Sequence, residues 1–291
     1  MSIQVRDLTH IYNEGLPGEQ LALDRINFDI FDGEIVSIIG HTGSGKSTLV
    51  QHLNGLLKPN SGHIIVGNVD ITAKGVKMRD IRRRVGLVFQ YPEYQLFEET
   101  VYKDIAFGPK NLELSDEEID QRVREAIELV GLDFEKIKDR SPFELSGGQK
   151  RRVAIAGILA MKPQVLILDE PTAGLDPGAH REILDMIKNF HRQAPEKIII
   201  MVTHNMDDVV EMSDKVIVMD RGRMLTTGTP REVFLQKKHL ENIGLDVPPV
   251  TELMYKLKEK LGNEIRSDIL TEEEALSEIL KYLKGENQKN D

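Results

Sequence analysis

The 291-residue sequence contains no cysteine, and its 48 acidic side chains outnumber its 38 basic ones. Without cysteine there is neither a disulfide framework nor a thiolate metal site. The formal net charge of -10 argues against the broad basic face on which non-specific nucleic-acid binding depends. We therefore expect no nucleic-acid partner.

Long apolar segments are also missing. The longest runs, Val165 to Leu168 and Ile198 to Val202, are far shorter than the roughly 20 residues that span a bilayer. The first residues, Met-Ser-Ile-Gln-Val-Arg-Asp, lack the charged start and apolar core of a secretory signal. Any role at a membrane therefore requires a partner that spans it.

Short β-branched segments alternate with helical patterns along most of the chain, which favours an α/β fold with a sheet covered on both faces. A long interval between two of these segments is mainly helical, and it includes the capping box Ser115-Asp-Glu-Glu118. We expect it to form a helical subdomain of about residues 91–160. The predicted strands are Ile3 to Val5, Ile26 to Ile30, Ile35 to Ile39, Ile64 to Val66, Val85 to Phe89, Val165 to Leu168, Ile198 to Val202 and Val216 to Met219.

The pattern changes after about residue 240. Pro248-Pro249 interrupts the chain, and two amphipathic helical patterns follow. We divide the sequence into a domain of residues 1–240 and a C-terminal appendage of residues 241–291. Two apolar stripes exceed what a small appendage needs to cover its own domain, so we expect it to hold two chains together; the alternative is that it folds back on its own chain. The stripes are Leu253, Leu257 and Leu261, then Leu276, Ile279, Leu280 and Leu283.

The segment from Gly40 to Ser47 matches the phosphate-loop pattern G-x-x-x-x-G-K-[ST], and it lies between a predicted strand and a predicted helix. Its glycines let backbone N–H groups converge on an anion, Lys46 brings a charge to the β- and γ-phosphates, and Ser47 offers a hydroxyl to Mg²⁺. The alternative is a glycine-rich surface turn. The residues expected to bind a nucleoside triphosphate are Gly40, His41, Thr42, Gly43, Ser44, Gly45, Lys46, Ser47 and Thr48.

An acidic pair, Asp169-Glu170, ends the apolar run that begins at Val165. Parallel strands deliver such residues to a ligand crevice, where Asp169 suits Mg²⁺ and Glu170 suits polarising the attacking water. Two solvated acids are the alternative.

A second anion-binding helix start is predicted at Leu145-Ser-Gly-Gly-Gln149, where Ser146 can cap a helix beginning near Gln149. Gly147 and Gly148 would allow close approach to a phosphate. Because one γ-phosphate does not need two such cradles from one subunit, this segment suggests contact with another chain's nucleotide. An ordinary capped loop is the alternative.

With these motifs the chain resembles the nucleotide-binding subunits of ATP-binding cassette (ABC) transporters, over nearly all of its first 235 residues. The resemblance implies ATP and Mg²⁺ as ligands and a P-loop fold of the ABC ATPase type, with an antiparallel β subdomain, a helical subdomain and a small C-terminal helical appendage. It implies that Gln90 contacts Mg²⁺ or the water, that His204 bonds the γ-phosphate, and that Asp176, in the loop Gly174-Leu-Asp176, contributes to nucleotide binding. It also implies that Tyr12 stacks on adenine; the alternative is that Tyr12 only packs against the β-rich edge.

A narrower resemblance, to the ATPases of energy-coupling factor (ECF) transporters, rests on Tyr91 to Val101, Phe107-Gly-Pro109 and Asn54 to Pro59. His41-Thr42 and Gly15 to Gln20 lean towards the second of two paralogous types. This resemblance implies an ATP-hydrolysing subunit that energises import of vitamins or transition-metal ions, located peripherally at the cytoplasmic face of the membrane. Its implied partners are a second ATPase chain, a transmembrane coupling protein and a membrane substrate-binding protein.

Other functions stay open at this point. The chain could serve another ABC importer, or act as a soluble ABC ATPase without a transport role. A regulatory module that binds nucleotide without turnover would be expected to lack Lys46, Glu170 or His204, and all three are present.

Overall fold

The structure is a computed structural model that describes residues 1–262 and 265–289. Its centre is a six-stranded sheet in the order β10-β9-β3-β8-β7-β6, parallel except for the β9–β10 pair. Every residue of β3, β7 and β8 is buried, which explains their unbroken apolar runs. The strands are β3 (Ile35–Ile39), β6 (Val85–Val88), β7 (Val165–Asp169), β8 (Ile198–Val202), β9 (Lys215–Asp220) and β10 (Arg223–Gly228).

A second sheet is antiparallel, with the order β2-β1-β4-β5. Its buried residues form one apolar cluster with residues from α1 and from one face of the central sheet. The helix α1, which follows the phosphate loop, therefore shares an apolar core with both sheets. The elements are β1 (Ile3–Tyr12), β2 (Gln20–Ile30), β4 (Ser61–Val66), β5 (Val69–Asp70), α1 (Lys46–Leu53) and α2 (Met78–Arg84).

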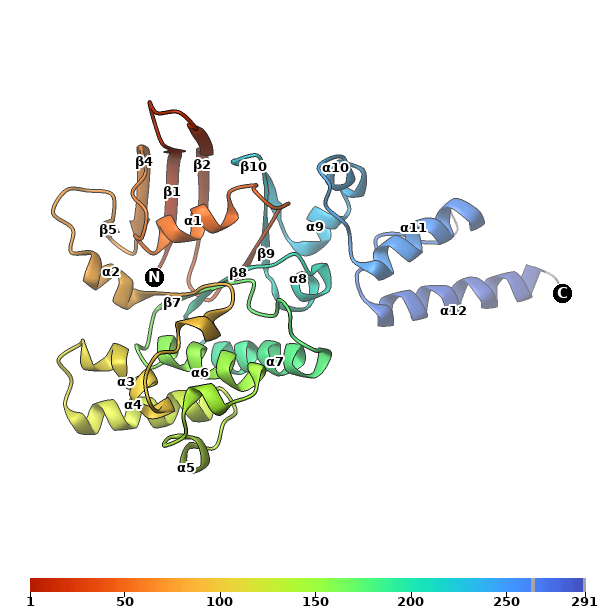
Figure 1. Cartoon of the computed structure of the whole chain (residues 1–291). Coiled ribbons are helices and arrows are strands. Elements are labelled where there is room, and N and C mark those ends of the chain that lie inside the picture. Colours follow the sequence, from red (N-terminus) through yellow and green to blue (C-terminus); the bar gives the residue numbers. More distant parts are fainter. Residues whose placement is uncertain (263–264, 290–291) are drawn as a thin grey trace.

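Helices cover the other face of the central sheet and extend into a lobe, seen below the sheet in Figure 1. The apolar residues of this lobe are continuous with Leu166, Leu168 and Ile199 of the sheet. Ser115 caps α4, since its side chain accepts from the N–H of Glu118, but the Glu118 carboxylate pairs with Arg122, so only the serine half of the predicted capping box is found. The elements are η1 (Pro92–Gln95), α3 (Val101–Lys110), α4 (Asp116–Leu129), α5 (Phe134–Ile137), η2 (Pro142–Glu144), α6 (Gly147–Leu159) and α7 (Pro177–Gln193).

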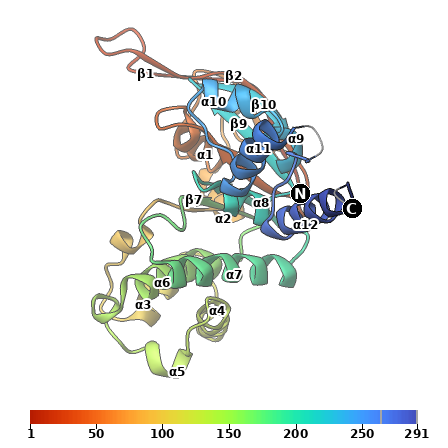
Figure 2. The same cartoon turned by 90° about the vertical axis from the view of Figure 1, so that its right-hand side faces the viewer.

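The C-terminal helices project from the molecule beyond α9 and α10, at the right of Figure 1, and they face the viewer in Figure 2. A small cluster of Met254, Ile265, Ile269 and Ala275 is buried between them. The last helix, α12, continues through Gly285 to Lys289, and residues 290–291 lie outside the described residues. The elements are α8 (Met206–Met212), α9 (Pro230–Phe234), α10 (Lys237–Asn242), α11 (Pro249–Leu261) and α12 (Glu272–Lys289).

The expected fold class is confirmed, with its mixed sheets, helical lobe and C-terminal helices. Among the helices of the described residues, none combines the length and the apolar character that crossing a bilayer requires.

Candidate functional site

The phosphate loop connects the end of β3 to the start of α1. A Cβ atom at Gly40 would lie 2.4 Å from the carbonyl oxygen of Met219, and one at Gly45 would lie 2.6 Å from that of Ala22. Gly45 also has φ of 102°, in the left-handed region. These two positions require glycine because backbone from β9 and β2 fills the space beside the loop.

Lys46 is the first residue of α1, and its ammonium group folds back over the loop. Its Nζ donates to the carbonyl oxygens of Gly40 at 2.7 Å and His41 at 3.0 Å. Burial lowers the pKa of Lys46, and the negative charges of Glu170 and Asp169 oppose that shift. The cation therefore lies at the mouth of the loop, where phosphate oxygens could replace the two carbonyls.

Asp169 is the last residue of β7 and is only 6% exposed. Burial raises its pKa, whereas a hydrogen bond from Ser47 and the charge of Lys46 lower it. Gln90 follows β6, and it lines the same surface cavity as Asp169 and Ser47. Hydroxyl, amide and carboxylate oxygens are ligands that suit Mg²⁺, and a bound cation would offset the burial that raises the pKa of Asp169. The donor set therefore fits the predicted magnesium ion.

No cluster of three or more histidine, aspartate or glutamate side chains able to hold a metal ion occurs within the described part of the chain. A magnesium site would accordingly depend on Ser47 and Gln90 as well as Asp169.

Glu170 and His204 form a pair at the ends of β7 and β8. Oε2 of Glu170 lies 2.7 Å from Nδ1 of His204, and the N–H of Glu170 donates to the carbonyl oxygen of Val202 at 2.9 Å. Glu170 has φ of 52°, a strained value for a residue with a side chain, and such strain clusters at functional sites. Burial raises the pKa of Glu170, while His204 lowers it. A carboxylate with a raised pKa beside a ligand cavity suits a general base.

These groups line one cavity of about 640 Å³. It brings together residues from the phosphate loop and from the ends of three neighbouring strands, as expected for a crevice at the carboxyl ends of parallel strands. The predicted site residues that line it are Gly40, His41, Thr42, Gly43, Lys46, Ser47, Gln90, Asp169, Glu170 and His204.

Four further residues complete the lining: Met206, Gly244, Leu245 and Asp246. The last three belong to the linker between α10 and α11. Sequence reasoning did not point to them, because no local motif marks a linker that returns to the phosphate loop.

Ser44, Gly45 and Thr48 belong to the loop and helix but do not line the cavity. Ser44 is fully buried, and the hydroxyl of Thr48 lies 3.2 Å from that of Tyr12. Tyr12 thus lies beside the start of α1, and its stacking on adenine stays a prediction.

The remaining predicted residues form a separate group at the N-termini of α6 and α7. Ser146 and Gln149 make a capping box, but α6 begins at Gly147, earlier than expected. Asp176 caps α7 by accepting from the N–H groups of Gly178 at 2.9 Å and Ala179 at 3.0 Å. A Cβ atom at Gly148 would lie 3.3 Å from that of Ala179. The segment from Ser146 to Gln149 and the Asp176 loop are therefore neighbours, and neither lines the cavity of its own chain.

Arg151 of α6 is a residue whose importance the sequence did not reveal. It is 2% exposed and pairs with both carboxylate oxygens of Glu93, at 2.7 and 3.0 Å. It also donates to the carbonyl oxygens of Pro171 and Ala173. Arg151 thereby ties the helix that starts at Gly147 to the segment after Gln90 and to the loop after Glu170.

Comparison with known proteins agrees with this geometry. Residues 23–173 match the model of the family described as ABC transporter. Two similar relatives are named energy-coupling factor transporter ATP-binding protein EcfA2. The one from Caldanaerobacter subterraneus subsp. tengcongensis is 60% identical over 98% of this chain and 99% of its own length. The one from Clostridioides difficile is 59% identical, with the same coverage.

Two solved structures are also similar. CbiO1 from Clostridium perfringens, described as part of the ABC transporter complex CbiONQ, has a TM-score of 0.73 and 42% identity, covering 87% of this chain and 98% of that one. The cassette MJ0796, solved as a dimer in a post-hydrolysis state with ADP and Pi, has a TM-score of 0.69 and 28% identity, covering 78% of this chain and 98% of that one. The phosphate loop, the acidic pair and the whole-length similarity together establish that this chain belongs to the ABC transporter family of ATPases and, within it, to the ECF transporter ATP-binding proteins of the second paralogous type.

Proposed function

We propose that this ATPase works as one half of a head-to-tail dimer, in which each ATP is held by the phosphate loop of one chain and covered by the segment Ser146 to Gln149 of the other. The observation that carries the proposal is the division of the predicted residues into two groups. The cavity collects one group, whereas the N-termini of α6 and α7 hold the other, outside the cavity of the same chain. A second chain, either a copy or a paralogue, would supply the missing half.

Within such a site each residue has a distinct task. Lys46 would neutralise phosphate charge, and Ser47, Gln90 and Asp169 would hold Mg²⁺, which would neutralise charge on the phosphate oxygens when bound. Glu170 would orient a water molecule and accept its proton as the water oxygen bonds to the γ-phosphorus and the bond to the β–γ bridging oxygen breaks. His204 already holds the Glu170 carboxylate at 2.7 Å, so it would fix the base and reach the γ-phosphate.

Mixing two inactive variants tests the trans arrangement. In a mixture of a Lys46→Ala chain with a Gly147→Asp chain, one composite site keeps both an intact phosphate loop and an intact α6 start. We expect ATPase activity to return in the mixed dimer, while each variant alone stays inactive. A Cβ at Gly147 meets no atom within 4 Å, so the side chain of the aspartate starts in open space. Confirmed mixed pairing without any recovered activity would contradict the proposal.

The transmembrane partner is proposed to dock on a mainly apolar groove of about 330 Å³ beside the segment after Gln90. Phe97 is 58% exposed there, and its ring meets that of Phe107 edge-on with centroids 5.1 Å apart. Leu96 lines the same groove but is only 8% exposed and packs within the helical lobe, so a charged residue there would disturb the fold.

Phe97→Glu is therefore the sharper test of docking. We expect it to reduce transport in membranes while leaving the ATPase activity of the isolated chains. Phe143→Glu is the matched control, because Phe143 is 62% exposed and does not line the groove. Unchanged transport with Phe97→Glu would count against the groove as the docking site.

The partners at the membrane would place the protein peripherally at the cytoplasmic face, together with a coupling protein and a substrate-binding protein that selects the cargo. Vitamins or transition-metal ions remain the proposed cargo classes, and the membrane substrate-binding protein would select between them. Residues 241–291 are proposed as the dimerisation appendage beside a nucleotide domain of residues 1–240. In support, Leu253, Leu261, Leu276, Leu280 and Leu283 are each at least 41% exposed.

A further inference from the structure

Glu170, the proposed general base, has a backbone conformation that needs support from its surroundings. Its φ of 52° lies in the left-handed region, which a residue with a side chain adopts only at a cost in free energy. Such a conformation persists where neighbouring groups fix it. On one side the N–H of Glu170 donates to the carbonyl oxygen of Val202 at 2.9 Å. The segment that follows Glu170 has to supply the rest of the support.

That segment forms a short turn. The N–H of Ala173 donates to the carbonyl oxygen of Glu170 at 3.2 Å. The carbonyl oxygens of Pro171 and Ala173 both accept from Nη1 of Arg151, at 3.2 Å and 2.7 Å. One guanidinium nitrogen therefore holds both ends of residues 171–173, directly after the base.

Glu93 fixes the guanidinium group through its other nitrogens. Nε and Nη2 of Arg151 donate to the two carboxylate oxygens of Glu93, at 3.0 Å and 2.7 Å. Two parallel bonds of this kind set the direction of the guanidinium plane as well as its position. Both side chains are largely buried, so water competes little for these bonds. The Glu93 pair thus keeps Nη1 of Arg151 directed at the turn after Glu170.

A second left-handed residue lies beside the same guanidinium group. Tyr91, directly after Gln90, has φ of 56°. Its ring centroid lies 5.6 Å from the guanidinium carbon of Arg151, and a Cβ atom at Gly174 would lie 3.6 Å from its Cε1. The two backbone segments that leave the nucleotide cavity after Gln90 and Glu170 therefore meet at Arg151.

The energetics of a buried ion pair indicate what this arrangement does. Removing two charges from water costs about as much as their attraction returns, so such a pair adds little stability over apolar side chains of similar size. Its consequence here is geometric: the Arg151–Glu93 pair fixes the carbonyl oxygens of the turn, and the turn fixes the backbone of Glu170.

We propose that Arg151, oriented by Glu93, is a positioning residue for ATP hydrolysis. It holds the turn after Glu170, and this keeps the carboxylate of Glu170 where it accepts a proton from the attacking water. The proposal rests on the role proposed above for Glu170. Arg151 is not among the residues that line the nucleotide cavity, so it acts through residues 171–173 and takes no part in the bond-breaking step.

Arg151→Lys tests the proposal, because lysine keeps the charge but has a single nitrogen that cannot reproduce the fork of a guanidinium. In the ATPase-active dimer of full-length chains we expect kcat to fall about 10- to 100-fold, since a misplacement of about 1 Å can cost this much. The equilibrium affinity for ATP should equal that of wild type. Wild-type kcat, or a loss of ATP affinity as large as the loss of kcat, would overturn the proposal.

The same substitution in a Glu170→Gln chain shows whether Arg151 acts through Glu170. We expect it to lower the residual turnover of Glu170→Gln by less than about twofold, because two residues that act as a unit are not additive. A further loss of about tenfold or more would show that Arg151 acts elsewhere.

The two proposals fail in distinguishable ways. Near wild-type turnover by Glu170→Gln would refute the base itself and, with it, the positioning role. An inactive Glu170→Gln beside a fully active Arg151→Lys would refute the positioning role alone.

Glu93→Gln provides a second variant in case Arg151→Lys does not fold. Glutamine keeps the size of the side chain but turns one acceptor into an N–H donor that faces the guanidinium group, so the orientation of Arg151 is lost. We expect kcat to fall about three- to tenfold, the effect of one weakened hydrogen bond, with unchanged ATP affinity. Wild-type kcat in this variant would contradict the proposal.

Arg122→Lys is the matched control. Arg122 lies in the same helical lobe, its side chain is largely buried, and it pairs with Glu118 at 2.6 Å, within α4. We expect its kcat and ATP affinity to equal those of wild type. A loss of kcat similar to that of Arg151→Lys would show that any buried arginine of the lobe has this effect, and the specific role of Arg151 would be refuted.

Discussion

The nucleotide cavity and the C-terminal helices differ in how far a single chain completes them. The cavity stands at the end of strands in which every residue is buried, and its side chains already meet partners such as His204 and Asp220. Between α11 and α12 the buried cluster is small, and Leu276 and Leu283 remain 61% and 50% exposed. The phosphate-loop half of the nucleotide site is the finished region within one chain, although its cover is proposed to come from a second chain. The C-terminal helices instead leave apolar surface for a partner to cover.

The stripes of α11 and α12 illustrate the same contrast. Leu257 and Ile279 pack partly against the small cluster, as the fold-back alternative requires. Leu253, Leu276 and Leu280 face solvent, as the dimer hypothesis requires. The appendage therefore uses one side of its helices for itself and keeps another available.

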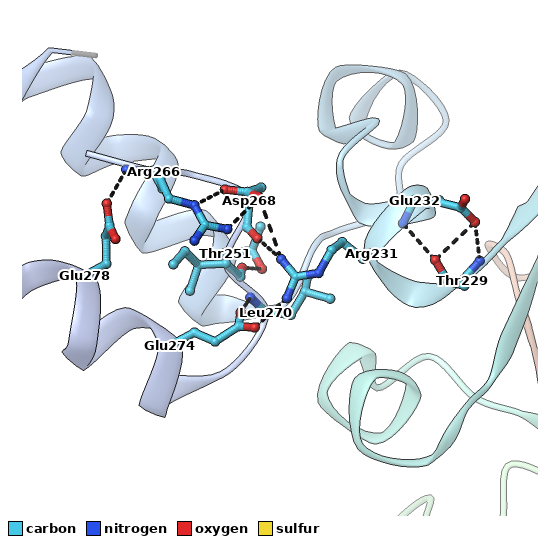
Figure 3. A network of polar contacts seen from close by, with 10 residues as sticks. Thr229, Arg231, Glu232, Thr251, Arg266, Asp268, Leu270, Glu274 and Glu278 are labelled. Carbon is cyan, nitrogen blue, oxygen red and sulfur yellow. Dashed lines mark hydrogen bonds and ion pairs between the residues drawn. The ribbon is translucent and has the colours of Figure 1, made fainter. Parts of the chain in front are cut away.

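A polar network joins α9 to the C-terminal helices (Figure 3). Arg231 of α9 bonds the carbonyl oxygen of Asp268 and the carboxylate of Glu274. The hydroxyl of Thr251 donates to the carbonyl oxygen of Ile269 at 2.5 Å. Since the linker that passes from α10 to α11 also lines the nucleotide cavity, the position of the appendage and the shape of the cavity are physically connected.

The largest effect should come from breaking the finished region at Glu170. Glu170→Gln removes the proposed base, so steady-state hydrolysis should fall about 100- to 10,000-fold while ATP still binds. Lys46→Ala should instead remove most of the ATP affinity. Phosphate release and equilibrium ATP binding, measured for both variants, distinguish the two roles. Near wild-type turnover by Glu170→Gln would refute its assignment.

Changes in the C-terminal helices should affect the association of two ATPase chains and not the hydrolysis of ATP. Replacing Leu276 and Leu280 together by glutamate should weaken nucleotide-free pairing with the partner ATPase chain by at least about 100-fold, because two buried leucines together contribute about 3–6 kcal/mol. Light scattering with and without ATP measures this. Leu16→Glu is the control, since Leu16 is 63% exposed at the far connection between β1 and β2. If the double variant pairs as well as wild type, the appendage is not the dimer clamp.

The pH dependence of hydrolysis should report the environment of Glu170. Burial raises the pKa of Glu170, so the active carboxylate is present above that raised pKa and is lost as the pH falls through it. Turnover at saturating ATP should drop about tenfold per pH unit below that point. Because His204 lowers the pKa of Glu170, residual turnover of His204→Ala should lose activity at a higher pH. If His204→Ala and wild type lost activity at the same pH, His204 would not lower the pKa of Glu170 as proposed.

The smallest effect should come from the connection between the regions. Arg231→Ala should destabilise the packing of α11 and α12 on α9 by less than about 1 kcal/mol, because the arginine side chain is 40% exposed. Faster amide exchange in both helices, with unchanged ATP affinity, is the expected result. Arg266→Ala is the control, since Arg266 pairs with Asp268 within the appendage. Equal effects of the two variants would deny Arg231 a special bridging role.

The sequence by itself determined the chemistry and the succession of elements. The spacing from Gly40 to Ser47, the acidic pair after an apolar strand and the cap at Ser146 are local patterns, and local patterns follow from hydrogen bonding and side-chain periodicity within a few residues. For the same reason the predicted strands correspond to observed ones: Ile35–Ile39 and Ile198–Val202 match β3 and β8 at both ends, and the others differ at one or both ends.

Only the tertiary structure decided which distant residues meet. Asp220 reaches His41 through the register of β3 and β9, Arg151 reaches Glu93 across the helical lobe, and Asp246 returns to the cavity along a linker without a motif. It also decided that Leu96 is buried whereas Phe97 is exposed. Each of these pairings depends on how whole elements pack against one another, and periodicity along one segment does not record the register or orientation of another.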